Sequence, residues 1–169
     1  WQPELADDMR RETLAFARYL LWEEKRPLGD LLNARVTFLT PRLAKHYGLK
    51  PQPGDFAKYD LTRSPRGGLL TQGSLLTIGG DEASMVTRGL FVLHDLLRGS
   101  VKDPPPGVDT TPVPSAPGLP QRLIAERRIR DQSCGGCHAK FEPLAFGLEQ
   151  YDGLARYARA QGIPTTSIQ

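Results

Sequence analysis

The chain has 169 residues, of which 39% are apolar and 24% charged, a composition typical of a globular domain that folds without disulfide staples. Its formal net charge is only +3, and the arginine-rich stretch at residues 122–130 is interrupted by Glu126. A nucleic-acid-binding module normally clusters its basic side chains, so we expect no nucleic-acid partner. Apolar runs such as residues 90–93 are far too short to cross a bilayer, so we also expect no membrane span.

The only two cysteines lie three residues apart and are followed at once by a histidine, in the order Cys134-Gly135-Gly136-Cys137-His138. This is the attachment pattern of covalent haem c. Two thiols at this spacing can add to the two vinyl groups of one porphyrin, and the next residue then lies under the iron as an axial ligand. The intervening glycines allow a tight backbone turn. We therefore predict one covalent haem c, bound by Cys134, Cys137 and His138.

Three other interpretations of the cysteine pair remain open: a structural zinc site, a redox dithiol and a chance pair of buried thiols. A structural zinc site needs four ligands, and the chain has no second cysteine pair and no closely spaced histidine pair. A redox dithiol is expected where a strand meets a helix, but residues 119–131 before the motif have a helical pattern. A zinc-binding module is therefore an alternative to haem, although the spacing favours haem.

In the N-terminal part, an apolar stripe predicts a long amphipathic helix over residues 4–25. Thr40 and Pro41 are typical of a helix start, and Gly48 of a helix end, so a short helix is expected over 41–47. Residues 51–68 are rich in proline and glycine and are predicted to be a connecting loop.

In the C-terminal part, we predict a short helix over 69–78 and a stronger one that Ser84 caps and Gly99 ends. Seven prolines between 104 and 120 predict an extended strap over 101–120. The arginine-rich segment 119–131 and residues 144–159 are predicted to be helical, the second with an interruption near Gly153.

These elements predict a mostly α-helical fold, a small cytochrome c-like helical domain with an N-terminal helical extension and a long proline-rich strap. We expect one haem c domain over residues 1–169, because neither side of the strap has enough apolar residues for a core of its own. Residues 1–68 would form the helical extension and loop, and residues 69–160 the haem-binding core.

Several motifs resemble the C-terminal region of the large planctomycete-type cytochrome c proteins of undefined function. They are Asn33–Leu39, Leu43–Leu49, Arg66–Gln72, Ser84–Gly89, the triple proline at 104–106, Cys134–His138 and Phe141–Gly153. The resemblance covers roughly residues 25–157 and implies a haem c domain outside the cytoplasm, within a larger protein. Many relatives carry a histidine shortly before the haem motif, where this chain has Arg128.

The second axial ligand cannot follow the motif, because no histidine or methionine comes after His138. It must lie upstream, come from another domain, or be absent. Met9 falls on the apolar stripe of the first helix and is interpreted as a core residue. His46 lies in the last turn of its helix, where a cation suits the helix dipole, and is also interpreted as structural.

Met85 is the favoured ligand because it begins a helix. Gly89, at i+4, would let a flat ring approach the backbone, and Arg88, at i+3, could meet a haem propionate. His94 as ligand and an open sixth site remain alternatives.

Around the haem, we expect Phe141, Leu144, Phe146 and Leu148 to form an apolar wall. The second ring nitrogen of His138 should donate to a carbonyl near Glu142 and Pro143, because proximal histidines are usually oriented in this way.

The predicted function is one-electron transfer through a haem ligated by His138 and Met85, in a periplasmic or other extracytoplasmic protein. The partner would be a redox protein or another domain of the parent chain. A five-coordinate haem enzyme or ligand sensor is the alternative, so whether the chain is an enzyme stays open.

Overall fold

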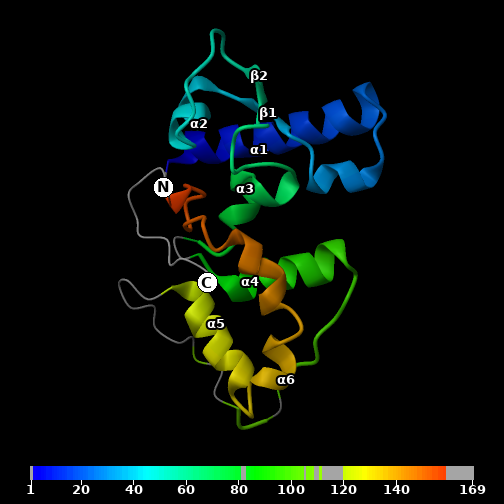
Figure 1. Ribbon diagram of the computed structural model, residues 1–169, viewed down its shortest axis with the longest axis vertical. Coiled ribbons are helices and arrows are strands. Elements are labelled where there is room, and N and C mark those ends of the chain that lie inside the picture. Colours follow the sequence, from blue (N-terminus) through cyan, green and yellow to red (C-terminus); the bar gives the residue numbers. More distant parts are fainter. Residues whose placement is uncertain (1, 81–82, 105, 109–110, 112–119, 159–169) are drawn as a thin grey trace.

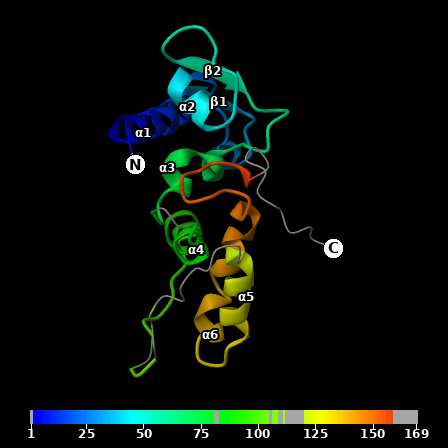
Figure 2. The same ribbon diagram turned by 90° about the vertical axis from the view of Figure 1, so that its left-hand side faces the viewer.

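The computed structural model describes residues 2–80, 83–104, 106–108, 111 and 120–158. About half of the chain is helical, with one small two-stranded sheet. Figures 1 and 2 show an elongated molecule with the N-terminal elements at one end, α5 and α6 at the other, and α3 and α4 between them. The prediction of a small, mostly helical protein is confirmed at this level.

The N-terminal end is built around α1, which begins with Pro3 at its first position and buries one apolar face. A π-helical turn, Tyr19–Glu23, extends it, so the predicted helix over 4–25 is confirmed with an end near residue 23. The elements of this end are α1 (Pro3–Arg18), the π-helical turn, a 3₁₀ helix (Leu28–Leu32), β1 (Val36–Leu39), α2 (Pro41–His46) and β2 (Ala57–Asp60).

The start and end of α2 agree with the prediction. The hydroxyl of Thr40 accepts the N–H of Leu43 at 3.1 Å, and Gly48 adopts a φ of +74° after the helix. The predicted loop over 51–68 is wrong in part, because Ala57–Asp60 pairs antiparallel with Val36–Leu39. Four-residue strands carry too little local signal to predict, and cross-strand pairing decides them here.

The middle and C-terminal elements are a 3₁₀ helix (Leu69–Thr71), α3 (Gly73–Leu76), α4 (Met85–Phe91) with a π-helical continuation (Val92–Leu96), α5 (Gln121–Arg130), α6 (Gly135–His138) and a 3₁₀ helix (Glu142–Leu148). The predicted helix over 69–78 is two short pieces, separated by the extended residue Gln72. Ser84 caps α4 as predicted, with its hydroxyl 3.2 Å from the N–H of Thr87.

The predicted helix over 144–159 is wrong beyond Leu148 in the part of the chain that the structure describes. A 3₁₀ helix ends at Leu148, and the chain then turns so that Tyr151 pairs with Tyr157 in an isolated bridge. The carboxylate of Asp152 accepts the N–H groups of Leu154 and Arg156, which stabilises the turn near Gly153. Of the predicted strap, residues 101–104, 106–108, 111 and 120 form no helix or strand, and the other positions lie outside the described residues.

The main core joins the two ends of the described chain. Leu5 and Met9 of α1 belong to the same buried cluster as Leu148, Tyr151 and Ala155. The hydroxyl of Tyr151 also donates to the carbonyl of Pro65 at 2.9 Å. The segment after the 142–148 helix is therefore part of the N-terminal core, and it holds that helix in place from one end.

A buried acidic group lies inside this core. The side chain of Glu12, 1% exposed, accepts hydrogen bonds from the hydroxyls of Thr37 and Tyr47, both at 2.6 Å. Burial raises the pKa of Glu12 to about 7, although these two hydrogen bonds and the charge of Arg66 oppose the shift. The guanidinium of Arg66 lies over the Tyr47 ring, 3.6 Å from its centre.

Candidate functional site

The Cys-x-x-Cys-His motif forms a short turn of helix that is anchored to the end of α5. Cys134 is the N-cap of α6, which runs from Gly135 to His138. The carboxylate of Asp131, directly after α5, accepts the N–H groups of Ser133 at 2.8 Å and Cys134 at 3.0 Å. These bonds from Cys134 and Ser133 lower the pKa of Asp131. The position of the motif is therefore set by α5.

The two glycines of the motif have different surroundings. A side chain at Gly135 would collide with the main-chain carbonyl of Ile129, whereas nothing lies within 4 Å of a side chain at Gly136. Gly135 is thus needed because α6 packs directly on the end of α5. Gly136 faces open space, which leaves its side of the turn accessible to a flat group.

Both cysteines are partly buried thiols. The imidazole of His138 is 24% exposed, and its ring centre lies 5.0 Å from that of Phe141. The structure thus brings Cys134, Cys137 and His138 together on one helical turn, each with a partly exposed side chain.

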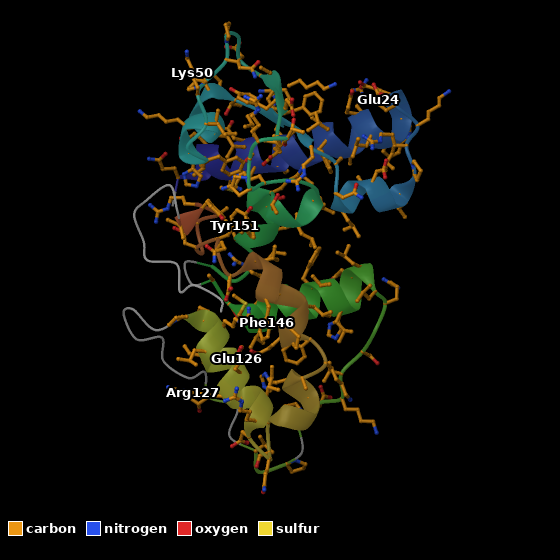
Figure 3. All side chains as sticks on the ribbon, viewed as in Figure 1. Glu24, Lys50, Glu126, Arg127, Phe146 and Tyr151 are labelled. Atoms are coloured by element: carbon orange, nitrogen blue, oxygen red, sulfur yellow. The ribbon has the colours of Figure 1, made fainter. Side chains whose placement is uncertain are left out.

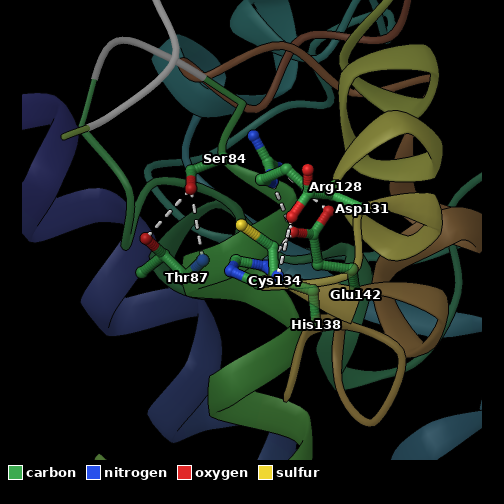
Figure 4. A network of polar contacts seen from close by, with 7 residues as sticks. All are labelled: Ser84, Thr87, Arg128, Asp131, Cys134, His138 and Glu142. Carbon is green, nitrogen blue, oxygen red and sulfur yellow. Dashed lines mark hydrogen bonds and ion pairs between the residues drawn. The ribbon is translucent and has the colours of Figure 1, made fainter. Parts of the chain in front are cut away.

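A buried carboxylate orients His138. Nδ1 of His138 lies 2.5 Å from Oε1 of Glu142, whose side chain is fully buried. Arg128 of α5 holds the same carboxylate at both oxygens, with Nε 2.7 Å from Oε1 and Nη2 2.9 Å from Oε2 (Figure 4). Because an ionised carboxylate only accepts, Nδ1 carries the hydrogen and Nε2 is left for another ligand.

The sequence places the partner of His138 among the carbonyls near Glu142 and Pro143, and the structure corrects this in part. The region is right, but the acceptor is the Glu142 side chain, and Pro143 is exposed at the start of the 3₁₀ helix. Glu142 lies four residues after His138, a spacing that brings side chains together on a helical turn and could have been noticed. The role of Arg128 depends on tertiary packing.

The expected apolar wall is only partly formed. Phe141 is buried, and Phe146 is half-buried beside α4 and α5, with the Arg122 guanidinium 4.7 Å from its ring centre (Figure 3). Leu144 is 37% exposed, and Leu148 belongs to the N-terminal core. Of the expected wall, Phe141 lies against His138, and Phe146 packs with Met85 and Ala125.

Met85 lies in the interior next to the elements that carry the motif. Its side chain is 1% exposed and packs in one cluster with Ala125 of α5 and Ala145 and Phe146 of the 142–148 helix. The helix before the motif and the helix after it therefore both contact Met85.

Arg88 donates to main-chain carbonyls in the interior. Its guanidinium makes five contacts with four main-chain carbonyls, those of Leu76, Leu148, Tyr151 and Asp152, at 2.7–3.2 Å. The side chain is 2% exposed, and burial lowers its pKa to about 10. With all five N–H donors used, Arg88 joins α3 and α4 to the turn after Leu148, and no donor remains for the predicted propionate contact.

Gly89 also has a different neighbour from the one expected. A side chain there would lie 2.3 Å from the carbonyl oxygen of Phe141. The close approach that glycine permits is thus used by the backbone of residues 141–142, which crosses α4 at this point. This contact fixes the main chain of Glu142.

The other candidate ligands lie elsewhere. His94 is exposed on the π-helical continuation of α4. Nε2 of His46 lies 2.7 Å from the carbonyl oxygen of Leu154, and Met9 belongs to the N-terminal core. Of these upstream residues, Met85 is the one buried against α5 and the 142–148 helix.

A zinc site gains no support. In the part of the chain that the structure describes, no three or more histidine, cysteine or acidic side chains are grouped so that they could hold a metal ion. Cys134, Cys137 and His138 alone would leave a tetrahedral site incomplete.

Comparison with known families identifies the chain in part. The family model PSCyt3, described as a protein of unknown function (DUF1588), matches residues 66–161. The chain belongs to this family. A second model, PSD4, described as a protein of unknown function (DUF1592), matches residues 1–49. Both are domains associated with planctomycete-type cytochrome c proteins, which agrees with the resemblance in the sequence.

No curated protein and no solved structure matches this PSCyt3 chain. Among the described residues, no helix is long and apolar enough to cross a membrane, as the sequence predicts.

Proposed function

We propose that the chain is a c-type cytochrome domain that transfers single electrons through one covalent haem, ligated by His138 and Met85. The observation that carries the proposal is the arrangement of Cys134, Cys137 and His138 on one turn of α6, with Nδ1 of His138 held by Glu142. This donor set fits haem c, since it offers two thiols at the attachment spacing and a free Nε2.

Each residue would have a defined task. The S–H of each cysteine would add across one vinyl C=C bond, which forms a thioether without loss of any atom. His138 would bind the iron through Nε2, in an orientation fixed by Glu142. A covalent haem would supply a reversible one-electron couple to this site.

Met85 is proposed as the sixth ligand because its thioether lies in the interior between α5 and the 142–148 helix. A ligand from α4 would reverse the usual chain order, placing the distal ligand about fifty residues before the proximal one. A methionine stabilises ferrous iron and raises the potential. Phe141 and Phe146 would limit access of water to the ring.

We further propose that the domain acts outside the cytoplasm, in the periplasm or another extracytoplasmic compartment, as part of a larger protein. Haem c attachment requires export and reduced cysteines. The electron partner would be a redox protein or another domain of the parent chain.

The proposal is tested by co-expressing the exported protein with a haem c maturation system and recording the visible spectrum of the reduced form. A six-coordinate low-spin c-type spectrum that resists carbon monoxide supports electron transfer through a closed site. A haem that binds carbon monoxide at once would replace this proposal with catalysis or ligand sensing. A protein without haem would overturn it.

A further inference from the structure

We propose that Glu142 tunes the redox couple, by making His138 a strongly electron-donating ligand and so lowering the reduction potential. This inference rests on the proposed function, since it concerns the haem that His138 would hold. It assigns Glu142 the role of a positioning residue that acts through His138, and Arg128 the role of holding Glu142.

The contact between the two side chains is short and sheltered. Nδ1 of His138 lies 2.5 Å from Oε1 of Glu142, and the Glu142 side chain is fully buried although His138 is 24% exposed. A hydrogen bond to a charged group at a buried position is stronger than the same bond at the surface. The imidazole is therefore polarised by a group that solvent does not screen.

Arg128 explains how a carboxylate is kept at this buried position. Its guanidinium, 17% exposed, binds both oxygens of Glu142, at 2.7 and 2.9 Å. Such a two-point contact fixes the plane of the carboxylate and compensates its charge. One lone pair of Oε1 remains directed at His138.

The backbone on the other side of Glu142 is also fixed. Gly89 of α4 lies so close that an added side chain would be 2.3 Å from the carbonyl oxygen of Phe141 and 3.2 Å from Cα of Glu142. The carboxylate is thus held by α5 through Arg128 and its main chain by α4. Both contacts hold Glu142 in the position where its carboxylate meets His138.

This arrangement has a predictable electronic effect. A carboxylate that accepts the Nδ1 hydrogen raises the basicity of Nε2 more than a neutral carbonyl does. A more basic ligand stabilises ferric iron over ferrous iron, and hydrogen bonding to an axial ligand is one of the means by which proteins set haem potentials. Glu142 therefore opposes the effect of Met85, and the couple lies lower than methionine ligation alone would give.

The test uses the haem-loaded protein and the variant Glu142→Gln, which keeps the shape of the side chain but removes its charge. We expect the midpoint potential, measured at one fixed pH, to rise by at least about 59 mV. For a one-electron couple, this rise is a tenfold change in the equilibrium constant between the oxidised and reduced forms. The ¹⁵N shift of Nδ1 in the ferrous protein should move toward that of an ordinary neutral imidazole. A purely structural role of Glu142 would leave both quantities unchanged.

Glu126→Gln is the matched control, because Glu126 lies on α5, the helix that carries Arg128, and also pairs with an arginine, Arg122, at 3.0 Å. It should leave the potential and the Nδ1 shift unaltered, and an equal rise in both variants would overturn the inference. If Glu142→Gln does not fold, the ¹⁵N shift of Nδ1 in the wild-type protein tests the proposal instead. A value typical of an ordinary neutral imidazole would contradict it. A protein without covalent haem would instead refute the proposed function, so the two failures are distinguishable.

Discussion

A side chain at Gly135 would place its Cβ 2.2 Å from the carbonyl oxygen of Ile129. This distance is far below any real Cβ contact, and the atom in the way belongs to the backbone at the end of α5. The turn that carries the two cysteines can therefore pack on α5 only if its first helical residue is glycine.

We expect Gly135→Ala to lower the free energy of unfolding by about 1–3 kcal/mol, as overpacking against a fixed backbone does. Gly136→Ala is the control, because no heavy atom lies within 4 Å of its added Cβ. Thermal unfolding of the two purified variants measures the difference. Equal destabilisation by both would show that α6 does not pack on α5 as described.

Stability should depend on pH through Glu12. Burial raises its pKa to about 7 in the folded protein, against 4.5 for the unconstrained group. The folded state then binds the proton more tightly than the unfolded state, so this contribution to stability is complete below pH 4.5 and is lost as the pH rises to about 7. Because each unit of pKa difference between the folded and unfolded states is worth about 1.4 kcal/mol, the free energy of unfolding should fall by a few kcal/mol.

Urea unfolding of wild type and Glu12→Gln at pH 5 and pH 8 measures this effect. In Glu12→Gln, the free energy of unfolding should differ much less between pH 5 and pH 8 than in wild type. Glu4→Gln, an exposed change on the same helix, should keep the wild-type difference. A pH dependence that persists in Glu12→Gln would assign it to other groups.

Arg88 should be essential for the connection between α4 and the turn after Leu148. Replacing it by methionine removes the guanidinium donors from the carbonyls of Leu76 and Tyr151, whereas those of Leu148 and Asp152 still accept the N–H groups of Tyr151 and Ala155. Because each buried carbonyl without a partner costs about 1–3 kcal/mol, we expect a loss of roughly 3 kcal/mol or more.

Arg127→Met is the matched control, since Arg127 is exposed on α5 (Figure 3). Its unfolding free energy should stay within about 0.5 kcal/mol of wild type. A similar small effect for Arg88→Met would mean that the five contacts contribute little to stability.

The ligand assignment predicts different results for Met85 and His94. In the haem-loaded protein, Met85→Ala should abolish the weak methionine-to-ferric charge-transfer band, lower the potential and admit carbon monoxide. His94→Ala should leave all three unchanged, because His94 is exposed. The opposite pattern would make His94 the ligand and the centre a bis-histidine haem.

Local sequence signals predicted the parts of this fold that local interactions determine. The apolar stripe of α1, the Thr40 and Ser84 caps and the glycine at position 48 all act within one or two helical turns, and the structure has each of them. The compact turn of the Cys134–His138 motif is also local, and the structure has it as α6, whereas its haem chemistry stays a prediction.

Long-range partners decided the features that could not be predicted. The strands β1 and β2 are each four residues long and are defined by their pairing. Arg88 has a sequence position that fits a propionate contact, yet carbonyls 60 or more residues away use its donors. The contact between Arg128 and Glu142 spans two elements separated by the motif itself.

The central claim is that Cys134 and Cys137 bind haem covalently, and mass spectrometry of the exported protein tests it most directly. After acid-acetone extraction and proteolysis, the account predicts one haem on the peptide that contains both cysteines, and none after Cys134→Ala with Cys137→Ala. A wild-type peptide with two unmodified thiols, from cells that attach haem to a control cytochrome c, would contradict the account.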